Sequence, residues 1–170
     1  HESDEIRRTK KMIQKEINKI GDTSTACYVS LISIVDSIAI STIGEQAKEL
    51  DLTVYNMPSS RLGYYNYKKD LIGINKRYVL RGLKEQGSTY YFDLTLETIF
   101  HECRHAWQYR NGWNIANHVS GHDDYDTYRK QHHEEDARDY ANREMTSLSL
   151  EDKEAIFRKI LSTLLYFNNN

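Results

Sequence analysis

The stretch LETIFHECRHAW, residues 96–107, decides how this sequence is interpreted. Its apolar side chains recur at intervals of three and four residues, which places them within about 100° of arc on a helix. They are Leu96, Ile99, Phe100, Cys103 and Trp107. This periodicity predicts an amphipathic helix that buries one side. We expect Asp93 or Thr95 to cap its start. The helix should run to about Arg110, with Gly112 as the stop signal.

The same stretch contains an H-E-x-x-H motif, His101-Glu-Cys-Arg-His105. Four residues on a helix turn through about 400°, so both imidazoles lie on one face, opposite the apolar stripe. Two imidazoles placed in this way can hold one zinc ion, and Glu102 is near enough to take a proton from a water molecule at the metal. The motif therefore predicts metal-assisted hydrolysis, with His101 and His105 as zinc ligands and Glu102 as the general base.

A catalytic zinc site needs a third protein ligand and an open position. An extension of the metzincin type would require Gly and His at positions 108 and 111, where this sequence has Gln108 and Asn111. A second helix downstream offers Glu134, followed at helical spacing by Ala137 and Ala141. Small residues let two helices approach closely enough for a carboxylate to reach the metal. Glu134 is therefore the predicted third ligand.

Other residues near Glu134 stay open as alternatives for the third ligand. His133 and His132 would give a ligand set of three histidines, and Glu135 is a further carboxylate. Asp136 or Asp139 could instead accept a hydrogen bond from a ligating imidazole.

Amide hydrolysis also needs a donor for the developing oxyanion. Tyr125, Tyr128 and Tyr140 are the nearest candidates in sequence to the second ligand helix, although packing is the usual role of a tyrosine. His118 and His122 lie in a polar loop, where we expect them to be exposed.

The remaining elements follow from periodicity and turn signals. We expect helices over 2–20, 25–50, 78–83 and 128–145, strands over 52–57, 62–67 and 71–75, and a last helix capped by Ser147 or Ser149. The strands at 62–67 and 71–75 flank a polar turn and predict a hairpin. The sequence therefore predicts one α+β domain over 1–170. It would comprise a helical extension (1–50), a catalytic core (51–145) and a C-terminal helix (146–170).

The first helix combines an isoleucine stripe with a basic face. The stripe consists of Ile6, Ile13, Ile17 and Ile20, and the basic face of Arg7, Arg8, Lys10, Lys11, Lys15 and Lys19. Such a face can bind nucleic acid or an acidic partner, but a solvated surface is the more common arrangement.

Composition limits the remaining possibilities. A net charge of −2 over 170 residues gives no strong signal for nucleic acid, and no run reaches the roughly 20 apolar residues that span a bilayer. We expect no membrane segment and no disulfide between Cys27 and Cys103, which favours the cytoplasm. A secreted effector remains open if a signal was removed, and the oligomeric state is not indicated.

The segment His101–Gln108, together with Glu134-x-x-Ala137, resembles the minimal zincin metallopeptidases, which are gluzincin-like, especially the compact ImmA/IrrE-type enzymes. The resemblance implies a small antiparallel or mixed sheet packed with its hairpin on the active-site helix, and an edge strand that receives an extended peptide. It implies a zinc peptidase acting on a protein or peptide. A SprT-like DNA-associated protease and a non-catalytic zinc-binding interaction domain are the alternatives. The chain departs from the pattern at Arg104, where small zincins often have a small residue.

Overall fold

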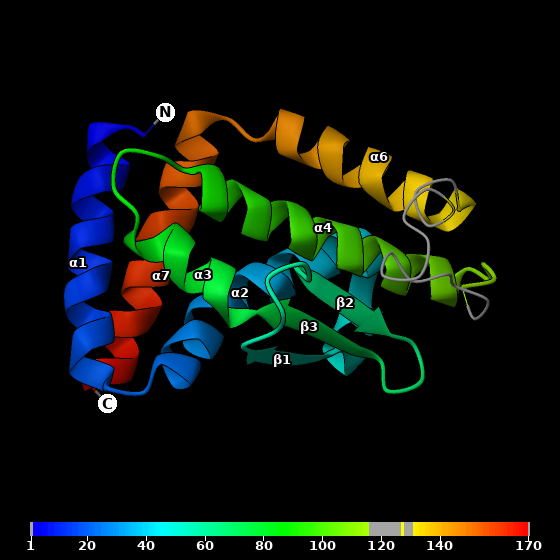
Figure 1. Ribbon diagram of the computed structural model, residues 1–170, viewed down its shortest axis with the longest axis horizontal. Helices are drawn as coiled ribbons and strands as arrows, with labels where there is room; N and C mark the ends of the chain where they lie inside the picture. The colour runs from blue at the N-terminus through cyan, green and yellow to red at the C-terminus, as the bar shows by residue number, and fades with distance from the viewer. Residues whose placement is uncertain (1, 116–126, 128–130, 170) are drawn as a thin grey trace.

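Helix α4 (Tyr90–Arg110) runs through the middle of the molecule, with a small sheet along one side and helix α6 (His132–Ser147) along the other (Figure 1). The computed structural model describes residues 2–115, 127 and 131–169. The other elements are α1 (Asp4–Ile20), α2 (Thr23–Ile43), the 3-10 helix η1 (Gly44–Glu49), β1 (Asp51–Tyr55), β2 (Gly63–Asn66), β3 (Leu71–Asn75), α3 (Lys76–Lys84) and α7 (Leu150–Asn169). The predicted α+β class is confirmed, and the described part of the chain is mostly helical.

The sheet is mixed, with strand order β1-β3-β2. β2 and β3 form the predicted antiparallel hairpin, whereas β1 pairs with β3 in parallel. This topology leaves β2 at an edge of the sheet. Its first residue, Gly63, packs directly on α4, because an added Cβ would lie 2.8 Å from Cγ2 of Thr98 and 2.7 Å from the carbonyl oxygen of Gly73. Only glycine permits this approach, which brings the edge strand against the helical turn before Glu102.

The apolar stripe of α4 lies in the core, as predicted. Leu96, Ile99 and Cys103 are at most 1% exposed, and Phe100 is also buried, whereas Trp107 is half-buried. Cys27 and Cys103 are both buried and free.

The predicted start of α4 is wrong by several residues. The helix begins at Tyr90, whose backbone N–H donates to Oγ of Ser88 at 3.1 Å. Asp93 therefore lies in the first turn, where its carboxylate accepts from the hydroxyl of Thr89 at 3.0 Å, rather than capping the helix from outside.

Helix α6 differs from its predicted range of 128–145. It begins at His132 and continues to Ser147, while residues 128–130 lie outside the described part of the chain. Helix α7 confirms Ser149 as its cap. The hydroxyl of Ser149 accepts from the backbone N–H of Asp152, and the Asp152 carboxylate accepts from the N–H of Ser149.

Helices α1 and α7 pack side by side at the end of the molecule that holds both termini (Figure 1). The isoleucine stripe of α1 is buried as predicted, except that Ile20 is half-buried. One residue of the expected basic face does not face solvent, because Lys10 is 0% exposed.

Helix α2 packs against α4 and α7, and its buried residues include Cys27, Leu31 and Ile34. By length and composition, the segment Thr23–Glu49 is also apolar enough to cross a membrane, although 44% of its most apolar stretch is buried inside the structure. Core helices of soluble proteins and signal sequences share these properties. The absence of a membrane segment therefore stays a prediction.

Candidate metal centre

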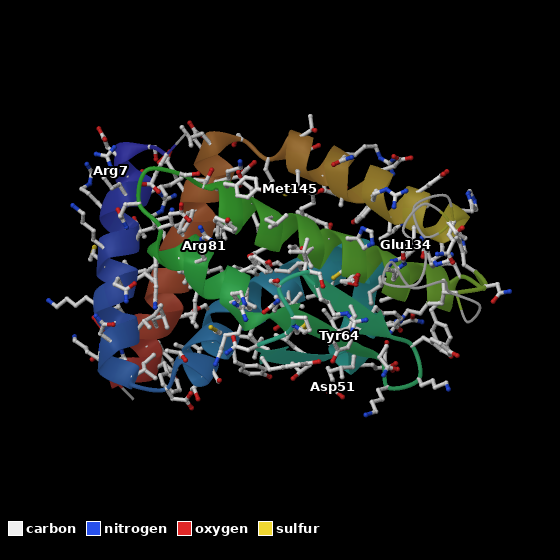
Figure 2. The ribbon with its side chains drawn as sticks, viewed as in Figure 1. Arg7, Asp51, Tyr64, Arg81, Glu134 and Met145 are labelled. Atoms are coloured by element: carbon white, nitrogen blue, oxygen red, sulfur yellow. The ribbon has the colours of Figure 1, made fainter. Side chains whose placement is uncertain are left out.

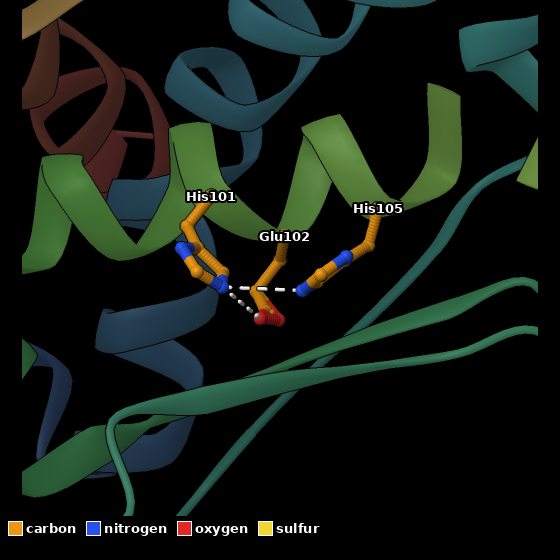
Figure 3. A group of neighbouring side chains, drawn as sticks. All are labelled: His101, Glu102 and His105. Carbon is orange, nitrogen blue, oxygen red and sulfur yellow. Dashed lines mark hydrogen bonds and ion pairs between the residues drawn. The ribbon is translucent and has the colours of Figure 1, made fainter. Parts of the chain in front are cut away.

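Three side chains of the H-E-x-x-H motif project from the same side of α4 (Figure 3). The Nε2 atoms of His101 and His105 lie 3.1 Å apart, with the two rings nearly perpendicular. Oε1 of Glu102 lies 4.0 Å from Nε2 of His101. One potential ligand atom from each residue lies within 4.8 Å of the other two. The helix therefore brings two imidazole nitrogens and one carboxylate to a single point.

Helix α6 adds a second carboxylate from 33 positions further along the chain. Oε2 of Glu134 lies 3.1 Å from Nε2 of His101, and Oε1 lies 2.9 Å from Nε2 of His105. Glu134 lies near the start of α6, close to α4 in the view of Figure 2, and is 2% exposed. Ala137 and Ala141 are 0% exposed, as expected for small residues that let the two helices approach closely.

The spacing of these atoms fits a metal ion of the size of zinc. Ligand atoms about 2.0–2.1 Å from a tetrahedral zinc ion lie about 3.3–3.4 Å from one another. The two Nε2 atoms lie 3.1 Å apart, and two different oxygens of Glu134 contact them, Oε2 at 3.1 Å from His101 and Oε1 at 2.9 Å from His105. These separations are slightly shorter than those around a zinc ion, so the side chains need only a small shift to accept it.

The electrostatics of the cluster keep Glu134 ionised. Burial by itself would raise the pKa of Glu134, but hydrogen bonds from His101 and His105 hold that pKa well below its usual range. Burial by itself would lower the pKa of His105, but the hydrogen bond to Glu134 raises it to about 9. A proton on the imidazole therefore balances the carboxylate, as a bound cation would.

Glu102 differs from Glu134 in its surroundings. It is 6% exposed, and its Oε2 atom is buried without a hydrogen-bond partner among the described residues. Burial raises the pKa of Glu102, and the charges of His101 and His105 oppose that rise. An orphaned carboxylate oxygen is costly in a folded protein, so such atoms need an explanation such as a catalytic role or an absent ion or water.

The structure separates the alternatives for the third ligand. His132 is exposed and stacks on the indole ring of Trp113, with ring centroids 4.9 Å apart, and Glu135 is also exposed. His133 lies closer, because its Nε2 atom is 3.8 Å from Oε1 of Glu134 and its ring centroid is 5.8 Å from that of His105. The predicted residue, Glu134, is the one that contacts both motif histidines.

Three residues behind His105 form a polar network. The sequence offered Asp136 as a direct acceptor for a ligating imidazole, but the structure places Gln108 between Asp136 and His105. Gln108 is 0% exposed, and its Oε1 atom lies 2.8 Å from Nδ1 of His105. Its amide nitrogen donates to Asp136, which also forms a two-point ion pair with Arg104 at 2.8 and 3.2 Å. Arg104 and Gln108 are positions at which the chain departs from family patterns. Both positions lie within one helical turn of His105, and this spacing was the sequence signal that could have linked them to that histidine.

Arg61, in the loop between β1 and β2, carries a positive charge that acts on Glu102. The buried amide of Asn75 donates to the carbonyl oxygen of Arg61 at 2.7 Å and to that of Pro58 at 3.3 Å, which ties down the loop. The Arg61 guanidinium lies over the ring of Tyr64, 5.2 Å from its centroid, and its positive charge opposes the rise in the pKa of Glu102. Arg61 was not singled out from the sequence, because nothing local marks it.

The structure gives a packing role to the one candidate oxyanion donor that it describes. The hydroxyl of Tyr140 lies 2.7 Å from the hydroxyl of Thr42 on α2, and its ring packs against Phe100. Tyr125 and Tyr128, like His118 and His122, lie outside the described residues.

No protein-family model matches the chain, and no curated protein or solved structure matches it either. The functional argument therefore rests on the motif and on the geometry described above.

Proposed function

We propose that this protein is a zinc-dependent peptidase in which His101, His105 and Glu134 hold the metal and Glu102 is the general base. The observation that carries the proposal is the convergence of two motif imidazoles on the carboxylate of Glu134, which comes from a separate helix. Two histidines on a single helix can be neighbours by chance. A buried carboxylate placed within 3.1 Å of both Nε2 atoms is the arrangement that a metal site requires.

A zinc ion at this point would supply a Lewis acid that polarises the scissile carbonyl group and makes a water molecule acidic. The protein's own groups carry out the proton transfers. Oε2 of Glu102, which has no hydrogen-bond partner, accepts the proton from the attacking water. Glu102 then gives that proton to the leaving amine. The positive charge of Arg61, which opposes the rise in the pKa of Glu102, would also favour the negative charge that develops on the substrate.

A protein or peptide substrate fits the position of β2. This strand is at an edge of the sheet and packs on α4 through Gly63. An extended peptide that pairs with the outer side of β2 would run alongside the helix that carries Glu102. The proposed substrate is therefore an extended segment of polypeptide.

The two alternative functions have weaker support. A purely structural zinc site has no use for an unpartnered carboxylate beside its ligands, as Glu102 provides. A nucleic-acid-binding role for α1 is weakened because Lys10 is buried, Arg7 pairs with Asp4, and Lys19 pairs with Glu16.

The test is the metal content of the purified protein, measured by elemental analysis after zinc is supplied and the excess is removed. We expect one zinc ion per chain in the wild type and none in His105→Ala. His132→Ala is the matched control, because that histidine is exposed and stacks on Trp113, and it should retain the metal. Absence of zinc from the wild type would overturn the proposal.

A further inference from the structure

Gln108 is a fully buried amide that contacts a ring of the proposed metal site. Its side chain makes three hydrogen bonds of 2.8 Å. The partners are Nδ1 of His105, the backbone carbonyl oxygen of His133 and Oδ2 of Asp136. One amide therefore connects a motif histidine on α4 with two positions on α6, the helix that carries Glu134.

The orientation of this amide is determined by its partners. A backbone carbonyl can only accept a hydrogen bond, and an ionised carboxylate can only accept as well. The ion pair with Arg104 keeps Asp136 in its carboxylate form. The nitrogen of Gln108 must therefore face α6, and its oxygen must face His105.

The orientation of the amide determines which nitrogen of His105 carries hydrogen. An amide oxygen accepts and cannot donate, so Nδ1 of His105 must carry a hydrogen in this contact. Nε2 is then the atom presented to His101 and Glu134. In the metal-free protein Nε2 also carries a proton, which it donates to Glu134. When a metal replaces that proton, the imidazole keeps its proton on Nδ1 and has its lone pair on Nε2, as metal binding from this side requires.

We propose that Gln108 is a positioning residue that holds His105 with its Nε2 lone pair directed at the metal, and that Asp136 holds Gln108 in the orientation needed for this. The inference rests on the proposed function as far as the metal is concerned. The placement of the proton on Nδ1 is a property of the metal-free protein and does not depend on that function.

The network also accounts for the departure at Arg104. Its guanidinium lies over the ring of Trp107, 3.8 Å from the centroid, and forms the two-point pair with Asp136. A small residue before the second histidine could not anchor Asp136 in this way. Arg104 and Gln108 on α4 thus form one hydrogen-bonded network with Asp136 on α6.

The main test is Gln108→Met, which preserves side-chain length but removes the hydrogen bonds. We expect zinc affinity, measured by competition with a chromophoric chelator, to fall about 10- to 100-fold. In the metal-free protein, NMR with ¹⁵N-labelled histidine should show an exchange-protected Nδ1–H proton on His105 in the wild type. That protection should be lost in the variant. Unchanged affinity together with a protected proton would overturn the proposal.

Two further variants separate positioning from simple anchoring of α6. Tyr140→Phe removes the hydrogen bond between Tyr140 on α6 and Thr42 without touching the hydrogen bonds of Gln108, so its zinc affinity should stay within about threefold of the wild type. Gln108→Glu retains an acceptor for Nδ1 but places a second carboxylate beside Asp136. Its stability should fall, whereas its zinc affinity should recover relative to Gln108→Met. Equal losses of affinity in all three variants would show a structural role only.

The outcomes also distinguish this inference from the proposed function. If the wild type binds no zinc but its Nδ1–H proton is protected and depends on Gln108, the metal function fails and the positioning role stands. If the wild type binds zinc and Gln108→Met binds it equally well with the proton still protected, the positioning role fails and the metal function stands.

Discussion

Two clusters of buried charge lie far apart in the structure and are completed in different ways. The lysine cluster joins α1 to the loop before α4. Nζ of Lys10 donates to Glu2 at 2.6 Å and to the carbonyl oxygens of Glu85 and Ser88 at 2.8 Å each. The other carboxylate oxygen of Glu2 accepts from the backbone N–H of Gly87 at 3.0 Å. Every donor of the ammonium group and both oxygens of the carboxylate have partners.

The histidine cluster, formed by His101, Glu102, His105 and Glu134, is buried to a similar degree but is incomplete. Oε2 of Glu102 has no partner, and two imidazole nitrogens share one carboxylate. A complete cluster contributes to the fold without any further component, whereas an unpartnered buried oxygen calls for an explanation such as a catalytic role or a bound ion or water. The comparison predicts opposite effects of substitutions in the two clusters. Changes in the histidine cluster should reduce hydrolysis or zinc binding, whereas changes in the lysine cluster should reduce the free energy of unfolding.

The largest effect should come from Glu102→Gln. We expect the rate of peptide hydrolysis to fall about 10²- to 10⁴-fold, because the general base is lost. The zinc content should be unchanged, since Glu102 is not among the proposed ligands. The free energy of unfolding of the metal-free protein should stay the same or rise, because an unpartnered buried carboxylate is removed. A fluorogenic peptide library and chemical denaturation measure the two quantities, and full activity in this variant would contradict the mechanism.

Lys10→Met should give the opposite signature. Removal of one partner from a buried ion pair costs about 3–5 kcal/mol of unfolding free energy, because the other charge is left uncompensated. The double variant with Glu2→Gln should recover part of that loss. Zinc content should not change in either protein. Lys11→Met is the matched control on the same helix, because Lys11 is exposed, and denaturation should show almost no change for it.

Glu134→Ala tests whether the histidine cluster is completed from α6. We expect zinc affinity to fall by more than about 100-fold, because loss of a direct ligand should cost more than the 10- to 100-fold lost with an outer hydrogen-bond partner. The neighbouring Glu135 is exposed, so Glu135→Ala should bind zinc normally. His133→Ala tests the competing candidate for the third ligand. A larger loss of affinity in that variant than in Glu134→Ala would transfer the third position to the histidine.

The sequence was most informative where local periodicity determines the structure. The apolar stripe of α4 and the hairpin of β2 and β3 follow from spacing within a few residues, and both are confirmed. Glu134 was selected for its position before Ala137 and Ala141. The structure brings its carboxylate to both motif histidines.

Other features depend on contacts that no local pattern encodes. Lys10 was assigned to a solvated face, but it is buried because carbonyl groups 75 and 78 positions away accept from it. Gln108 served only to exclude one family pattern, whereas its actual contacts depend on where α6 lies. The parallel pairing of β1 with β3 likewise depends on how the chain crosses the sheet. In each case the missing information was the tertiary arrangement.

The smallest predicted effect concerns Tyr140. A substitution at this position tests whether the residue has a packing role or a catalytic one. Its hydroxyl is engaged with Thr42 of α2, 2.7 Å away, so it holds α6 against the core rather than facing a substrate. Tyr140→Phe should therefore cost about 0.5–1.5 kcal/mol of unfolding free energy, as expected for loss of one hydrogen bond. Thr42→Val should cost a similar amount, and the double variant should cost less than the sum of the two. Peptide hydrolysis should be unaffected by either change. A fall of more than about tenfold in the rate of peptide hydrolysis in Tyr140→Phe alone would be the loss expected of an oxyanion donor. Tyr140 would then belong with the histidine cluster as a catalytic residue.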